Sequence, residues 1–396
     1  MTAATAALSP EPVTGSGPGV IADDTVTISW ADFRVWERQL ASSGACAHPI
    51  RLRGRIQAVD LATGEVAPVY DTADEHGGVL HVACGNRRET VCPACSQVYK
   101  RDARQLVRAG LSGGKGIPDT VAQHPCVFAT LTAPSFGPVH ARRMRGKTVL
   151  PCRPRRDAAK RVCPHGRDIS CPLRHHPEDR RLGRPMCADC YDYTAAVLFN
   201  AHAGELWRRF VTYLPRCFAR QLGLTMAELR QAVAIRYVKV AEYQARGIVH
   251  FHAIIRLDRA PGPGATDDYA PPDPRFTAGL LCQAINQSAA AAWITTRPRR
   301  TCPATLLRFG TQTDARPVRH GSDLPGTGQA LSAPAVANYI AKYATKALDA
   351  PGVPDRPLRS SADLAALSCS AHYRAMIATA WRLGGGLSAT ASRFCK

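Results

Sequence analysis

Two histidines separated by a single residue carry the strongest chemical signal in the sequence. His250 and His252 lie in the apolar run 248–257, whose β-branched and aromatic residues predict a strand. Because alternate side chains of a strand share a face, both imidazoles project to the same side. Two imidazoles on one rigid face provide two of the three ligands of a facial divalent-metal site. The spacing alone also fits two strand histidines that bind nothing.

The third ligand depends on the turn before this strand, because residues 234–243 form a second apolar run that predicts its hairpin partner. If residues 245–247 form a three-residue loop, the glycine takes the left-handed position that suits it. Glu242 then lies opposite His250, with the two Cβ atoms about 5 Å apart. A four-residue loop would instead place Ala241 opposite His250 and turn the glutamate away. The three-residue loop therefore predicts that the carboxylate joins the two imidazoles as a metal ligand.

A predicted helix at 335–348 supplies a complementary set of tyrosines and lysines. Tyr339 and Tyr343 lie one helical turn apart, and Lys342 and Lys346 lie three residues after them. A phenol is a poor nucleophile at neutral pH because its pKa is about 10. It can attack phosphorus when a metal polarises the phosphate and a cation stabilises the developing charge. The alternative is that the tyrosines line a core helix whose lysines lie at its solvent edge.

Together these elements resemble a known family, the HUH endonucleases, and specifically their two-tyrosine rolling-circle replication initiators. The resemblance rests on three motifs in the expected order, VFATLT at 127–132, HFH at 250–252 with Glu242 upstream, and YIAKYATK at 339–346. The segments 84–111 and 128–140 further resemble initiators of actinobacterial plasmids and integrative elements. The likeness covers roughly residues 35–383.

The resemblance implies an α+β fold, in which helices pack on one face of a central antiparallel sheet of the HUH/RRM-like type, with two small zinc-binding modules added. The strand at 127–132 and the histidine strand would be adjacent central strands. It also implies nicking and closing of origin DNA with Mg²⁺ or Mn²⁺. A tyrosine would stay joined to the 5′ phosphate, the free 3′ hydroxyl would prime rolling-circle replication, and a second tyrosine would accept the strand for closure. The implied catalytic residues are Tyr339, Tyr343, Lys342 and Lys346, and the implied metal ligands are His250, His252 and Glu242.

Two cysteine clusters predict structural zinc, because each contains a C-x2-C pair with further cysteines nearby. Four protein ligands leave no open position for chemistry, so these ions would stiffen loop-rich segments. Free thiols are the alternative, and Cys152 is predicted, with the other remaining cysteines, to be a core or surface thiol. The first predicted set is Cys46, Cys84, Cys92 and Cys95, with His48 as a substitute. The second predicted set is Cys163, Cys171, Cys187 and Cys190, with His165 and His175 as possible replacements.

A strongly basic segment, 141–185, surrounds the second cluster and carries fourteen Lys/Arg against four Asp/Glu. Such a balance predicts salt-sensitive contacts with DNA phosphates. A solvated cationic loop is the alternative. The predicted DNA-binding residues are Arg142, Arg143, Arg145, Arg153, Arg155, Arg156, Lys160 and Arg161.

The composition of the whole chain of 396 residues agrees with a polyanionic partner, because the formal net charge is +20. A hydrophobic content of 45% excludes a mainly disordered chain. No apolar run approaches the roughly 18 residues of a membrane span, and the first residues lack the features of a signal peptide. Fifteen cysteines without an export signal favour a cytoplasmic protein with metal-bound or free thiols.

Periodicity predicts the helices and strands that carry these groups, and the chain is predicted to divide into four regions. Helices are predicted at 97–109, 193–220 and 276–294, and strands at 124–133 and 305–318. The predicted regions are a disordered leader at 1–28, a zinc-binding module at 29–118, an endonuclease domain at 119–350 with a basic zinc-binding insertion at about 141–192, and a C-terminal helix with a divergent tail at 351–396.

The expected partners are plasmid origin DNA, both double-stranded and single-stranded, and a host helicase and polymerase, but no membrane. A host helicase is expected because residues 141–148 match a phosphate-binding loop only loosely and no helix is predicted after them. Two other classes stay open: a relaxase or single-strand transposase of the same chemistry, and a non-catalytic zinc-containing DNA-binding regulator. The regulator would form no covalent adduct with DNA.

Overall fold

The computed structural model describes residues 30–155, 161–262, 264, 269–298, 302–319, 331–345 and 357–384. Four predicted features lie outside these residues, namely the leader at 1–28, Arg156 with Lys160, Lys346, and the tail after residue 384. The chain divides into two compact units, residues 1–102 and 103–396. The division falls within helix α2 (Pro93–Ser112), so each unit contains one end of this helix.

Unit 1 has little apolar interior. Its described elements are α1 (Trp30–Ser42), β1 (Ile50–Leu52), β2 (Arg55–Val59), β3 (Val66–Asp71), η1 (Thr72–Asp74), η2 (His76–Gly78), β4 (Leu80–Val82) and the start of α2. The hairpin of β2 and β3 is exposed along most of its length. The buried cluster of this unit consists of Cys46, Cys92 and Cys95. A unit built in this way depends on something other than apolar burial for its stability.

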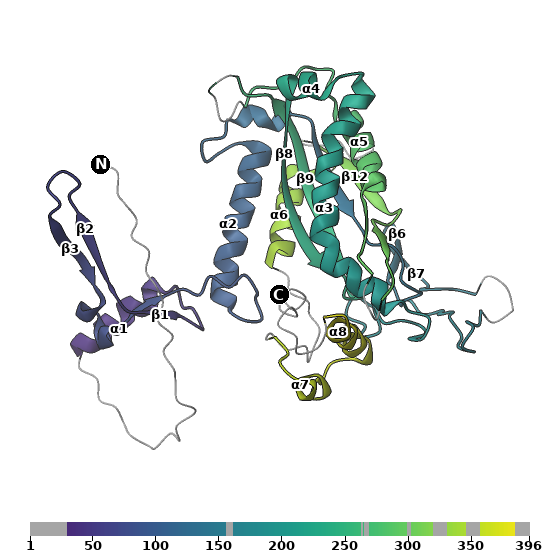
Figure 1. The fold of residues 1–396 in the computed structure, drawn as a ribbon, viewed down its shortest axis with the longest axis horizontal. Helices are drawn as coiled ribbons and strands as arrows, with labels where there is room; N and C mark the ends of the chain where they lie inside the picture. Colours follow the sequence, from purple (N-terminus) through teal and green to yellow (C-terminus); the bar gives the residue numbers. More distant parts are fainter. Residues whose placement is uncertain are drawn as a thin grey trace. The chain divides into compact units, whose positions relative to one another are not determined.

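Unit 2 is a mixed α/β structure built around a five-stranded sheet of order β13-β12-β5-β9-β8 (Figure 1). The strands are β5 (Cys126–Leu131), β8 (Val233–Tyr243), β9 (Val249–Arg259), β12 (Thr313–Arg319) and β13 (Leu331–Ser332). Neighbours are antiparallel except β12 and β13, which are parallel. The strands that carry VFATLT and HFH are adjacent, as the sequence predicts.

Helices cover both faces of this sheet, whereas the sequence predicts helices on one face only. Residues of β5 and β9 are buried on both sides of the sheet, so both faces are covered. One face packs against α3 (Tyr193–Leu222) and α5 (Ala278–Ala291). The other face packs against α6 (Ala333–Thr345) and the second half of α2. The helix α6 therefore lies over the face that carries the histidines.

The remaining elements of unit 2 refine the predicted boundaries. The segment predicted as one helix at 276–294 ends as a helix at Ala291 and continues into a short strand, β10. The segment predicted as one strand at 305–318 is broken around Gly310, where an added Cβ would lie 2.8 Å from the carbonyl oxygen of Ala133. The other described elements are η3 (Asp119–Gln123), β6 (Arg143–Arg145), β7 (Thr148–Leu150), α4 (Met226–Ala232), β10 (Trp293–Thr295), β11 (Leu306–Arg308), α7 (Ser361–Ala365) and α8 (Ala371–Leu383).

In the part of the chain that the structure describes, no helix has both the length and the hydropathy to cross a bilayer.

Candidate metal and tyrosine site

The hairpin of β8 and β9 has the three-residue loop that sets the predicted register. The Gln244 amide donates to the carbonyl of Ile248 at 2.9 Å, and the Gly247 amide donates to the carbonyl of Gln244 at 2.8 Å. Gly247 has a φ of 71°, the left-handed conformation that such a loop requires. Glu242 consequently pairs with His250 across the two strands.

The carboxylate and both imidazoles converge on one point. Nε2 of His250 lies 2.9 Å from Oε2 of Glu242, and Nε2 of His252 lies 3.3 Å from the same oxygen. Glu242 and His252 are buried. Burial lowers the pKa of His252 and so favours the neutral imidazole, the form that binds a metal. Two nitrogens and one carboxylate oxygen on a rigid hairpin form a donor set that fits a divalent metal ion.

Neighbouring side chains hold the two imidazole rings. Thr130 pairs with His252 across β5 and β9, and its Oγ1 lies 3.0 Å from His252 Nδ1. This hydroxyl can accept the Nδ1–H proton, which leaves Nε2 free to bind a metal. The amide nitrogen of Gln244 lies 3.4 Å from Nδ1 of His250. The sequence analysis missed Thr130. Its place in the VFATLT strand indicates contact with His252 only when the register of the two strands is known.

Two tyrosines of α6 lie against this group. The hydroxyl of Tyr339 is 3.4 Å from Nε2 of His252, and the rings of Tyr339 and Tyr343 have centroids 4.4 Å apart. The apolar residues Val336 and Ile340 are buried between α6 and the sheet, so the helix is fixed where its tyrosines face the histidines. The structure thus brings together the predicted metal ligands and the predicted tyrosines, which are far apart in the sequence.

The surroundings of Tyr339 disfavour its phenolate, which a nearby cation would stabilise. Its pKa is raised above the ordinary value, first by burial and then by Tyr343 and Glu242, which disfavour the phenolate. Lys342 is one available cation, with Nζ 5.7 Å from the centre of the Tyr343 ring. A divalent ion at the histidines would be another.

The loop of the hairpin is held by contacts with four other segments, and no sequence pattern pointed to these contacts. Arg246 donates to the carbonyls of Ala133 and Pro134 at the end of β5, at 3.2 and 3.0 Å. Asn200 of α3 donates to the carbonyl of Gly247 and accepts from the amide of Val249. The other two clamps are His372 of α8, whose Nε2 lies 3.0 Å from the carbonyl of Arg246, and Gly183, which lies against the carbonyl of Ala245.

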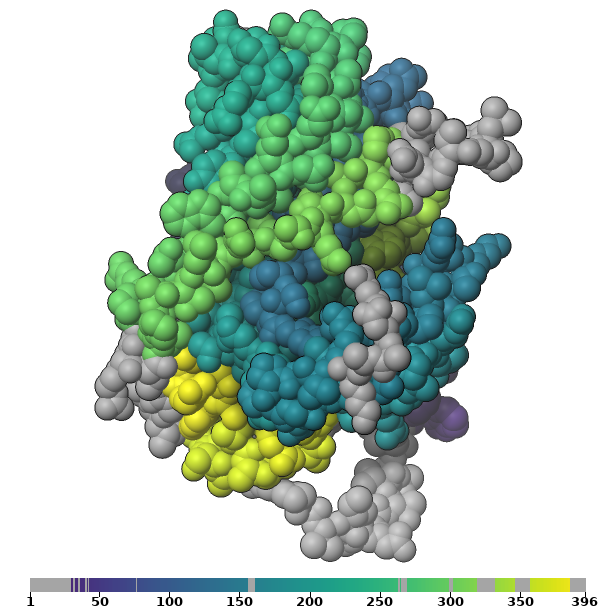
Figure 2. Space-filling view, turned by 90° about the vertical axis from the view of Figure 1, so that its right-hand side faces the viewer, coloured from purple at the N-terminus to yellow at the C-terminus, as the bar shows by residue number. Residues whose placement is uncertain are grey.

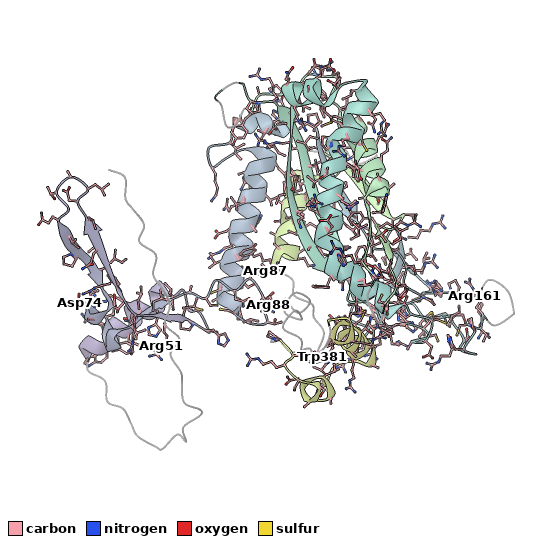
Figure 3. All side chains as sticks on the ribbon, in the orientation of Figure 1. Arg51, Asp74, Arg87, Arg88, Arg161 and Trp381 are labelled. Carbon is pink, nitrogen blue, oxygen red and sulfur yellow. The ribbon has the colours of Figure 1, made fainter. Side chains whose placement is uncertain are left out.

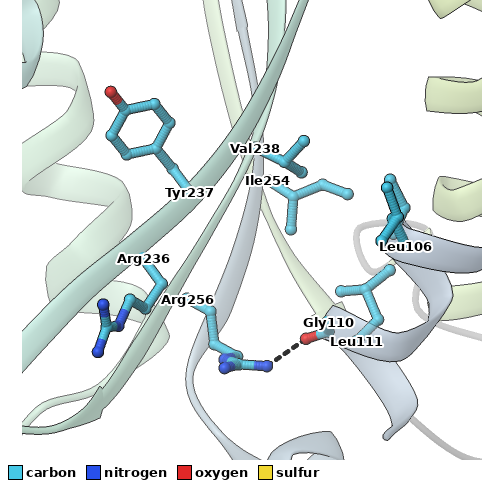
Figure 4. Close-up of a pocket in the computed structure, with 9 residues that line it drawn as sticks. Leu106, Gly110, Leu111, Arg236, Tyr237, Val238, Ile254 and Arg256 are labelled. Carbon is cyan, nitrogen blue, oxygen red and sulfur yellow. Dashed lines mark hydrogen bonds between the residues drawn. The ribbon is translucent and has the colours of Figure 1, made fainter. Parts of the chain in front are cut away.

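A pocket lies on the same sheet face as the histidines (Figure 4). It begins at Ile254, the next residue of β9 after His252 that faces this side. Val238 and Ile254 form its floor, and Leu106 of α2 lies at one side. Arg236 and Arg256 lie at its end, where Arg256 donates to the carbonyl of Gly110 and pairs with the buried Asp258. An apolar floor beside guanidinium groups can accept a planar base and a neighbouring phosphate.

The first cysteine cluster contains the four predicted ligands. Sγ of Cys84 lies 3.7 Å from Sγ of Cys95, and Sγ of Cys46 lies 3.8 Å from Sγ of Cys92. Thiolates at tetrahedral positions about 2.3 Å from a zinc ion would be about 3.8 Å apart. Backbone amides, that of Cys95 first, lower the pKa of the Cys92 thiol to about 6, which favours the thiolate. This donor set fits structural zinc.

The second cluster differs from the predicted set in one ligand. Cys163, Cys187 and Cys190 lie together with His165, which replaces Cys171. Nδ1 of His165 is 3.2 Å from Sγ of Cys190 and 3.8 Å from Sγ of Cys187. Assigning Cys171 to this cluster was wrong, because Cys171 forms a backbone bridge with Arg153 that places it elsewhere.

Cys171 instead lies in a group that the sequence analysis did not recognise. Its neighbours there are His140, Cys152 and His175. Cys152, predicted to be a core or surface thiol, is buried in this group. The C-x3-H spacing of Cys171 and His175 was the available signal, and His175 had been considered only as a replacement ligand for the second cluster.

Described basic residues of the insertion are mostly exposed. Arg142, Arg143 and Arg145 lie on or beside the short hairpin of β6 and β7. Arg155 is paired with Asp168 at 2.7 Å. Arg161 is exposed in the outer part of the insertion (Figure 3). These guanidinium groups could neutralise phosphates at the surface. The charge of Arg155 is already partly balanced by Asp168.

Comparison with known proteins gives the class of the molecule. A family model described as RepSA, replication initiator protein, pSAM2, matches residues 32–395. A replication initiator protein of Streptomyces ambofaciens is 42% identical over 364 residues, which are 91% of this chain and 73% of that protein. No solved structure matches. The predicted class of replication initiator is thus confirmed, and the chain belongs to the RepSA family of replication initiator proteins.

Proposed function

We propose that this replication initiator is a metal-dependent nicking and closing enzyme of the HUH type, which starts rolling-circle replication of a plasmid or integrative element. One observation carries the proposal: the hydroxyl of Tyr339 lies 3.4 Å from His252, at the point where both imidazoles and Glu242 converge. A regulator that only binds DNA has no need for a phenol, two imidazoles and a carboxylate in one place.

Each residue has a distinct part in the proposed reaction. Glu242, His250 and His252 would hold Mg²⁺ or Mn²⁺, which when bound would polarise the scissile phosphate. The Tyr339 oxygen loses its proton and forms a bond to phosphorus, while the bond from phosphorus to the 3′ oxygen breaks and that oxygen leaves as a hydroxyl. Lys342 offsets the negative charge that develops on the phosphate. The DNA is then joined through its 5′ phosphate to the tyrosine.

The two tyrosines differ in position, and this difference supports an order of use. Tyr339 is the tyrosine whose hydroxyl lies within hydrogen-bonding distance of His252, so we assign the first attack to it. Tyr343 is the next residue on the same helix face, and its ring lies 5.4 Å from that of His252. This position supports the use of Tyr343 to accept the strand when the displaced circle is closed.

The sheet face also supports a path for the DNA strand. From the histidines, the face continues to the pocket floored by Val238 and Ile254, where a base can stack while Arg236 faces the backbone. The arginines of the insertion would add contacts to phosphates of the origin that do not depend on base sequence. Strand separation and synthesis would come from a host helicase and polymerase.

The direct test is a covalent adduct. The chain is incubated with candidate single-stranded origin DNA and Mn²⁺ or Mg²⁺, digested, and searched by mass spectrometry for a phosphotyrosine-linked peptide. We expect the link on Tyr339. A DNA complex without any adduct under either metal would favour the non-catalytic regulator. An adduct that forms on transfer-origin or transposon-end DNA but not on a replication origin would favour a relaxase or transposase.

A further inference from the structure

The insertion contains a second cysteine–histidine cluster besides the one at Cys163, and it lies close to the hairpin loop. We propose that this cluster binds a zinc ion of its own, and that this ion anchors the loop of the catalytic hairpin. The ligands are His140, Cys152, Cys171 and His175, whose donor atoms all lie within 4.8 Å of one another.

The distances fit a tetrahedral zinc site. Nδ1 of His140 lies 3.3 Å from Nε2 of His175, and Sγ of Cys171 lies 3.6 Å from the same nitrogen. Around a zinc ion with bonds of about 2.05 Å to nitrogen and 2.3 Å to sulfur, nitrogens would be about 3.3 Å apart and a nitrogen and a sulfur about 3.6 Å apart. Cys152, Cys171 and His175 are buried, as structural zinc ligands usually are.

The surrounding contacts orient these ligands toward a common centre. Nδ1 of His175 lies 2.7 Å from Oδ2 of Asp179, which in turn pairs with Arg181 at 2.8 Å. A histidine that donates its Nδ1–H to a carboxylate presents Nε2 as a lone pair, the arrangement found around metal-bound histidines. The backbone amide of Ala141 donates to Sγ of Cys152 at 3.2 Å, which stabilises a thiolate. One cation would be coordinated by all four of these donor atoms at once.

The cluster is connected to the hairpin loop through the backbone. His140 pairs with the returning end of the insertion: its amide donates to the carbonyl of Arg184 at 2.9 Å, and its carbonyl accepts from the amide of Gly183 at 2.8 Å. Gly183 has a φ of 81°, and an added Cβ there would lie 2.2 Å from the carbonyl carbon of Ala245. The segment fixed by His140 therefore lies directly on the loop that joins Glu242 to His250. In Figure 2, the insertion lies beside α8, which clamps the same loop.

Zinc content tests the metal assignment without DNA. The full chain carrying His250→Ala and His252→Ala, in which the Glu242 group cannot compete for zinc, is examined by native mass spectrometry. The described residues contain one cluster of four cysteines and two clusters of cysteines with histidines, so we expect three zinc ions per chain. We expect two ions after Cys171→Ser and still three after Cys282→Ser, a matched change on α5 outside the clusters.

Two results would overturn the assignment. One is an unchanged zinc count after Cys171→Ser. The other is a parent chain with only two ions, of which Cys92→Ser removes one and Cys163→Ser removes the other. The second result needs no substitution within the proposed site, so the assignment can be refuted even if Cys171→Ser fails to fold.

Nicking tests the connection to the hairpin, and this part rests on the proposed function. In the otherwise unaltered chain, we expect Cys171→Ser to lower the rate of adduct formation about tenfold, as loss of a supporting contact does at metal sites. Gly183→Ala should lower it while all the zinc is retained, and Cys282→Ser should not change it. Undiminished nicking by Cys171→Ser with one zinc ion missing would refute the connection. If the proposed function itself fails, the unaltered chain forms no adduct and the zinc counts are unaffected.

Discussion

Thr130→Val removes one hydroxyl from the proposed metal site and changes almost nothing else. The hydroxyl lies 3.0 Å from Nδ1 of His252, and valine has nearly the same shape and favours strands. Without an acceptor for Nδ1–H, the ring is no longer held with Nε2 toward Glu242. The loss of such a partner weakens metal binding about 10- to 100-fold, which corresponds to about 1.4–2.7 kcal/mol.

The assay is the Mn²⁺ dependence of adduct formation on a labelled origin oligonucleotide. We expect the half-maximal Mn²⁺ concentration to rise about 10- to 100-fold, and the rate at saturating Mn²⁺ to recover, because Tyr339 is untouched. Thr313→Val is the control, since Thr313 pairs with Leu131 of β5 and so lies on the opposite sheet face. An unchanged Mn²⁺ dependence of Thr130→Val would refute the role of Thr130 in orienting His252 as a ligand.

Four other substitutions test the remaining parts of the site and the first cysteine cluster. His250→Ala removes a nitrogen ligand and should abolish adduct formation but not duplex binding in a gel-shift assay; undiminished cleavage would contradict the metal site. Tyr339→Phe should abolish the first cleavage, whereas Tyr343→Phe should spare cleavage and impair strand joining, both followed on end-labelled DNA; the reverse pattern would assign the first attack to Tyr343. Cys92→Ser removes a buried zinc thiolate and should expose residues 30–102 to protease while adduct formation by unit 2 persists; unaltered protection would contradict a structural ion there.

The hairpin was predictable from sequence because its geometry is local. Strand alternation puts His250 and His252 on one face, and the glycine at position 247 selects the loop length that places Glu242 opposite. The tyrosines were predictable as a pair on one helix face for the same reason. Their approach to His252 depends on how α6 packs on the sheet, and only the family resemblance pointed to it.

The long-range contacts were not predictable, since no local rule constrains them. Four cysteines near two histidines can be grouped in several ways, and only the path of the backbone through Arg153 separates Cys171 from Cys163. The helices on the second sheet face were missed for a related reason. On one face β9 carries His250, His252 and Arg256 beside Ile254, so its sequence gives little sign of helices packed on that face.

Phe128 lies behind the site, with its ring stacked on that of His252 at 5.7 Å and touching the edge of Tyr339 at 5.5 Å. In the proposed reaction the Phe128 ring would exclude water from one side of the tyrosyl phosphodiester, so water could not attack the phosphorus from that side. In that reaction the ester would conserve the energy of the severed phosphodiester until the strand is closed. The final ligation can then proceed as a simple exchange of ester bonds, with no ATP consumed.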